Sequence, residues 1–158
     1  MGRLAALLLV LAFSPRLADA QSAAQTLSFA INAINQIAFV GTPALTIATA
    51  TAGYAPSSAT NATATWAVTT NQSGAKITAN IPTAMPAGLT LSANLVAPTG
   101  GLSSGYMALG ITAVDVVTGI TKVAEGALGV TYKLDATPAA GVVASASRVV
   151  TYTITGGT

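Results

Sequence analysis

Residues 64–82 read ATWAVTTNQSGAKITANIP, and the alternation of side chains in this stretch decides the fold class. Trp66 and Val68 share one face of an extended chain, and the residues between them are small or polar. After NQSG at 71–74 the same alternation resumes from Ile77. A period of two with one apolar face is typical of a half-buried antiparallel strand. The NQSG stretch can close a tight hairpin between two such strands.

The same alternation recurs in three later stretches, GLTLSANLVAP, LGVTYKLDA and RVVTYTITGG. Loops rich in Pro and Gly separate them at 82–88, 97–105 and 137–141, and short turns are expected at 117–119 and 124–126. Threonine on the outward faces favours strands while keeping the solvent side polar. The pattern predicts an all-β fold, an antiparallel β-sandwich that is Ig-like or pilin-like, with about seven to nine strands.

Residues 25–41, QTLSFAINAINQIAFVG, fit two interpretations. Alternation favours two strands, at 26–32 and 36–40. The spacing of Leu27, Ile31, Ile34 and Ala38 also fits one face of a helix. The next stretch predicts one strand through Leu45, Ile47 and Thr49, followed by a long loop of small residues.

The chain opens with the features of a secretory signal peptide. Arg3 precedes an unbroken apolar run at 4–13, and Ala18-Asp19-Ala20 fits a cleavage site. Ten apolar residues in a helix span about 15 Å, half of the roughly 30 Å hydrocarbon core. We therefore expect residues 1–20 to be removed and residues 21–158 to form one exported domain without a transmembrane segment.

The processed chain carries four cations and three anions, a net charge of +1. So few cations exclude the electrostatic footprint of a nucleic-acid binder. The chain has no cysteine and no histidine, which removes disulfides, thiolate ligands and the usual general base. We expect no enzyme activity, no metal and no cofactor. Hydrolysis by two of the remaining carboxylates, Asp115, Glu125 and Asp135, is the less favoured alternative, and Lys133 is expected to pair with Asp135 on a strand face.

Three aromatic residues are candidates for ligand contact, because aromatic faces can stack on sugar rings. Tyr54 and Tyr106 lie in or beside Gly-containing loops. Trp66, the single tryptophan, has an alternative position between the two sheets, because Val68 shares its phase.

Two stretches carry a resemblance to known surface proteins. TWAVTTNQSGAKITANIPTAMPAGLTLSANLVAPTG resembles the W-x-aliphatic strand, hairpin and following strand of bacterial WxL-type surface domains. SRVVTYTIT, at 147–155, is similar to their last strand and to terminal strands of fimbrial subunits. The resemblance implies a secreted β-sandwich at the cell surface, and the WxL likeness implies attachment to peptidoglycan.

These features predict an exported structural protein, a subunit of a pilus-like or cell-surface assembly whose partners are itself or other envelope proteins. Copies with so little net charge repel each other weakly, and sheet edges can associate. Residues 25–40 are a candidate for strand exchange with a neighbour. The alternative is a module that binds cell-wall glycan through its exposed aromatic residues.

Overall fold

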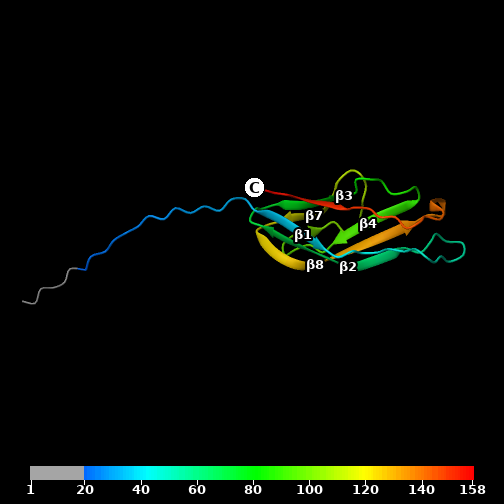
Figure 1. The fold of residues 1–158 in the computed structure, drawn as a ribbon, viewed down its shortest axis with the longest axis horizontal. Helices are drawn as coiled ribbons and strands as arrows, with labels where there is room; N and C mark the ends of the chain where they lie inside the picture. The colour runs from blue at the N-terminus through cyan, green and yellow to red at the C-terminus, as the bar shows by residue number, and fades with distance from the viewer. Residues whose placement is uncertain (1–19) are drawn as a thin grey trace, which may run out of the picture. The chain divides into compact units, whose positions relative to one another are not determined.

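The computed structural model describes residues 20–158, so the predicted signal peptide lies, apart from Ala20, outside the described residues. The chain divides into two units, Met1–Ile31 and Asn32–Thr158. The second unit is a sandwich of two antiparallel sheets (Figure 1). In the described part of the first unit, residues 20–31 form no helix and no strand.

One sheet has five strands in the order β1-β2-β8-β4-β6, and the other has four in the order β5-β7-β3-β9. Every strand pairing in both sheets is antiparallel. The predicted all-β sandwich is therefore confirmed, with nine strands and one short 3₁₀ helix in the described residues. The elements are β1 (Asn35–Val40), β2 (Ala59–Thr70), β3 (Ala75–Asn80), β4 (Leu89–Leu95), β5 (Leu102–Ser103), β6 (Met107–Ala108), β7 (Val114–Ile120), β8 (Val123–Ala136), the 3₁₀ helix η1 (Pro138–Ala140) and β9 (Thr151–Thr155).

The apolar phase of each strand faces the space between the sheets. In β2 the buried residues alternate with more exposed ones from Ala64 to Thr70, and in β3 they alternate from Ala75 onward. Because side chains on a strand point alternately to its two faces, this pattern fills the interior from both sheets at once. The largest fully buried side chains are Trp66, Ile77, Ile81, Leu95, Ile120, Val68, Val116, Val117 and Val130.

The predicted hairpin at 71–74 is wrong in one respect. The turn joins β2 to β3, but these strands lie in different sheets and do not pair with each other. Strand β2 pairs with β1 and β8, whereas β3 pairs with β7 and β9. Both strands have an apolar face that must meet the same interior, and placing one in each sheet buries both faces.

The two short turns predicted at 117–119 and 124–126 are also wrong. The first lies inside β7 and the second inside β8. The chain reverses between these strands near Lys122, whose φ is 44°. The residues of 124–126 are instead accommodated by a bulge: the pairing of β2 with β8 shifts register between Trp66 and Val68, and Ala127 has a φ of 56°.

The strand predicted at 36–40 is confirmed as β1, but the one at 26–32 is wrong. Residues 26–32 form neither a strand nor the alternative helix. The strand predicted through Leu45, Ile47 and Thr49 is not assigned, although Leu45 and Ile47 are half-buried and their neighbours are exposed. The burial of side chains in this stretch alternates as in a strand, but the backbone forms no strand ladder.

Candidate functional site

Trp66 is a core residue. Its side chain is 1% exposed, and its Nε1 donates a hydrogen bond to the carbonyl oxygen of Val96 at 3.1 Å. The ring of Phe39 stacks on it with centroids 5.9 Å apart. Ligand contact through Trp66 is therefore wrong, because no face of the indole is open, and the alternative position between the sheets is confirmed.

Tyr54 and Tyr106 are both at the surface, with exposed fractions of 76% and 48%. Tyr54 precedes β2, in a turn closed by its N–H to the carbonyl oxygen of Thr51. Tyr106 precedes β6, an edge strand of the same sheet, and β8 and β4 lie between β2 and β6. The two rings therefore belong to separate surfaces, and a ligand role for either remains a prediction.

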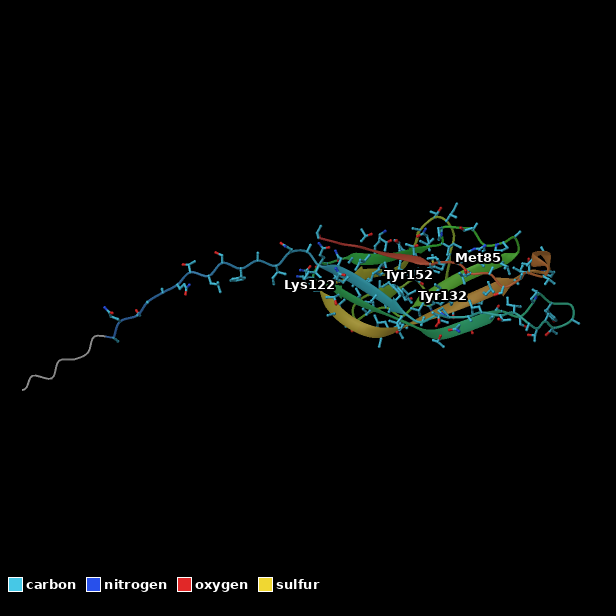
Figure 2. All side chains as sticks on the ribbon, in the orientation of Figure 1. Met85, Lys122, Tyr132 and Tyr152 are labelled. Carbon is cyan, nitrogen blue, oxygen red and sulfur yellow. The ribbon has the colours of Figure 1, made fainter. Side chains whose placement is uncertain are left out.

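Strands β1 and β9 are the facing edges of the two sheets, and they contact each other. Phe39 of β1 stacks on Tyr152 of β9 with centroids 3.9 Å apart. The hydroxyl of Tyr152 also shares a 2.8 Å hydrogen bond with the hydroxyl of Tyr132 on β8 (Figure 2). Burial raises the pKa of both phenols, so both stay neutral. These contacts close the edge of the sandwich along β1 and β9, which we call the seam.

The seam opens where β1 has ended and β9 has not yet begun. There the structure contains a groove of about 640 Å³. Residues 45–50 form one wall and residues from 141–148 form the other, while Met85, Leu89 and Leu134 lie at its floor. Figure 2 places Met85 on this side of the sandwich, away from the end marked by Lys122.

The floor of the groove is a part of the core that lacks cover. On β8, Tyr132 is buried but Leu134, the next residue of the same phase, is only half-buried. On β4, Leu91 is buried but Leu89 is again half-buried. Both strands therefore carry their apolar face past the point where the opposite sheet covers it.

The walls of the groove are also incomplete in their hydrogen bonding. Among the described residues, no backbone-to-backbone hydrogen bond involves residues 42–48 or 142–149. The side chain of Asn61 donates to the carbonyl oxygen of Ala44 at 3.1 Å, and the guanidinium of Arg148 donates to the carbonyl oxygens of Ser147 and Ala84. The other backbone groups of residues 42–48 and 142–149 have no hydrogen-bond partner in the described residues, and such groups are available to a further strand where they face solvent.

Sequence reasoning did not find this groove. Its signal was the stretch GVVASASRVV at 141–150, which places four valines between the predicted loop at 137–141 and the predicted last strand or at the start of that strand. Val142 and Val149 are indeed strongly exposed, and Val143 is 43% exposed on the groove wall. Contiguous exposed apolar side chains can mark an interaction site.

Residues 20–31, here called the N-terminal segment, expose three apolar side chains of one phase. Leu27, Phe29 and Ile31 are 82%, 90% and 81% exposed. Just after this segment, side-chain hydrogen bonds fix the chain to the sandwich. The Asn71 side chain donates to the carbonyl oxygen of Asn32 and accepts from the N–H of Ile34, both at 2.8 Å. The predicted exchange segment 25–40 is thus too long, because β1 belongs to the chain's own sheet.

The charged residues do not gather in one place. Lys133 and Asp135 form the expected ion pair at 2.9 Å, and Ser58 also donates to Asp135, which lowers the pKa of this carboxyl. Lys76 pairs with Asp115 at 2.9 Å. Glu125 accepts a hydrogen bond from the backbone N–H of Thr99 at 2.8 Å. Within residues 20–158 no group of three or more acidic side chains has the arrangement of a metal site.

Comparisons with family models, with curated proteins and with solved structures find no match to this chain. The resemblance to WxL-type and fimbrial surface proteins therefore remains a prediction. In the described part of the chain, no helix has the length and apolar character needed to cross a bilayer.

Proposed function

We propose that this protein is an exported, non-enzymatic structural protein that acts as a subunit of a pilus-like or cell-surface assembly through protein–protein contacts. The observation that carries the proposal is the N-terminal segment, in which Leu27, Phe29 and Ile31 are each more than four-fifths exposed. Water-exposed apolar side chains at alternate positions are costly unless a partner covers them.

The charge distribution supports the same proposal. Residues 20–75 contain no charged residue at all. This stretch includes the N-terminal segment, β1, one wall of the groove and β2. A surface without charge can be buried against another protein with no cost of desolvating an ion, and identical copies do not repel across it.

The test is the concentration dependence of the oligomeric state. We expect the processed chain, residues 21–158, to form oligomers whose mean mass rises with concentration in size-exclusion chromatography with light scattering. A mass that stays at the monomer value up to millimolar concentration contradicts the proposal. Removal of salt should change the mass little, because the contacts contain few charges.

A second candidate is a module that binds cell-wall glycan, favoured by the exposure of Tyr54 and Tyr106. An aromatic ring in solvent offers an apolar face to a sugar. Co-sedimentation with insoluble cell-wall polysaccharide tests it: the Tyr54→Ala/Tyr106→Ala variant should stay in the supernatant while the wild type sediments. Equal sedimentation of the two proteins would remove these tyrosines from any glycan site.

A further inference from the structure

The groove and the N-terminal segment are complementary in chemistry. The segment has free apolar side chains, and the groove has half-buried apolar residues, Leu89 and Leu134, that lack cover. The N-terminal segment has no charged residue, and Arg148 is the only charged residue that lines the groove. Contact between the segment and the groove therefore buries no charged group other than Arg148.

They are also complementary in backbone hydrogen bonding. Residues 20–31 form no ladder, and neither do the wall residues 42–48 and 142–149. An extended chain placed between the walls can supply the missing donors and acceptors, as in the addition of a strand to a sheet edge. The dimensions agree as well: residues 27–31 extend about 13 Å and the wall at 45–50 about 17 Å, at a rise of about 3.3 Å per residue.

The chain cannot fill its own groove with these three side chains. Asn35 pairs with Thr70, which pairs with Val123, whereas the groove floor at Leu134 lies eleven residues further along β8. At about 3.3 Å per residue that distance is about 35 Å. Leu27 is seven residues from Ile34, which Asn71 holds, so a fully stretched chain carries it only about 25 Å.

We propose that the groove of one copy receives residues 27–31 of a second copy as an added strand, with Leu27, Phe29 and Ile31 facing Leu89 and Leu134. This inference rests on the proposed function and names its partner. Each copy offers one segment and one groove, so the contact is head-to-tail and generates an open chain of subunits.

The test uses one variant of each partner surface in the processed chain. Phe29→Asp alters the segment, and Ile47→Asp/Val143→Asp alters the walls of the groove without touching a fully buried side chain. Each should raise the Kd of self-association at least about 30-fold. The matched controls are Ala30→Asp, on the opposite face of the same segment, and Val142→Asp, which is fully exposed and does not line the groove. Both controls should assemble as the wild type does.

Mixing the two defective variants gives the sharper result. The intact segment of the groove variant fits the intact groove of the Phe29→Asp variant, and no further contact is possible. We expect a 1:1 heterodimer from two proteins that are each monomeric, with no larger species. Circular dichroism and urea unfolding of each variant show that it is folded.

A disulfide reports the contact directly, because the wild-type chain has no cysteine. Phe29→Cys in one protein and Val143→Cys in another should cross-link under mild oxidation, and Ala30→Cys should cross-link to Val143→Cys far more slowly. Wild-type self-association that survives in Phe29→Asp or in the groove variant, or equal cross-linking of both cysteines, overturns this inference and leaves the proposed function standing. A wild-type chain that is always monomeric overturns both.

Discussion

The hydrogen bond between the hydroxyls of Tyr132 and Tyr152 gives a quantitative prediction, because it crosses from one sheet to the other. Tyr132 lies on β8 and Tyr152 on β9, and their oxygen atoms are 2.8 Å apart. The informative changes are Tyr132→Phe, Tyr152→Phe and the double variant, because phenylalanine keeps the ring and removes only the hydroxyl.

The expected magnitude follows from what each change leaves behind. Either single substitution removes one partner and leaves the other hydroxyl in a poorly solvated site, so the free energy of unfolding should fall by about 1–3 kcal/mol. The double variant leaves no orphan hydroxyl and should lose less than the sum of the two. The coupling energy of the cycle should be about 1 kcal/mol in favour of the pair.

Urea unfolding followed by fluorescence provides the assay, because Trp66 is the only tryptophan and its ring is buried. Tyr54→Phe is the control: this side chain is 76% exposed, and the free energy of unfolding should change by less than about 0.5 kcal/mol. A coupling energy below about 0.3 kcal/mol would show that the hydrogen bond does not tie the sheets together. Strictly additive losses would refute the reasoning in the same way.

Three further predictions concern strain, packing and pH. Gly88→Ala should lower the free energy of unfolding, measured in urea, by more than about 2 kcal/mol, which is about 1–2 kcal/mol more than the loss caused by the control Gly53→Ala. Both glycines have positive φ, but a Cβ at Gly88 would lie 2.5 Å from the backbone nitrogen of Ala140, whereas a Cβ at Gly53 would meet no atom within 4 Å. Ile77→Ala should cost about 2–5 kcal/mol in the same assay, because its side chain is fully buried in the core. Burial raises the pKa of Tyr152 above the ordinary 10.0, so its contribution is complete below that pH and is lost as the pH rises further; unfolding monitored above pH 10 should show a fall approaching about 1.4 kcal/mol per pH unit that Tyr152→Phe makes less steep.

The sequence predicts the sandwich well because local alternation determines which face of each strand is apolar. Trp66, Val68 and Ile77 reveal their burial by phase alone. Phase does not determine which strand pairs with which, and for this reason the hairpin at 71–74 is predicted within one sheet although β2 and β3 belong to two. Pairing depends on contacts between residues far apart in the chain.

The groove could not be predicted because it is defined by what is missing. Leu89 and Leu134 have the same alternating pattern as their buried neighbours, and only the structure places them beyond the cover of the opposite sheet. The segment at 26–32 shows the opposite failure, because here the sequence predicts an element that the structure lacks. Its alternation predicts a strand that does not form, because alternation alone does not supply the neighbouring strand that a ladder needs.

The magnitudes indicate what kind of contact the N-terminal segment can make. Full burial of Leu27, Phe29 and Ile31 contributes about 5–9 kcal/mol in total, whereas ordering five backbone residues costs about 5–10 kcal/mol. These terms nearly cancel, so a single contact depends on new ladder hydrogen bonds with the groove walls at about 0.5–1.5 kcal/mol each. Strand addition with such a balance is reversible and weak between isolated copies, with a Kd no tighter than micromolar. It becomes durable when copies are held at high local concentration, as they are on a surface or within a growing chain of subunits.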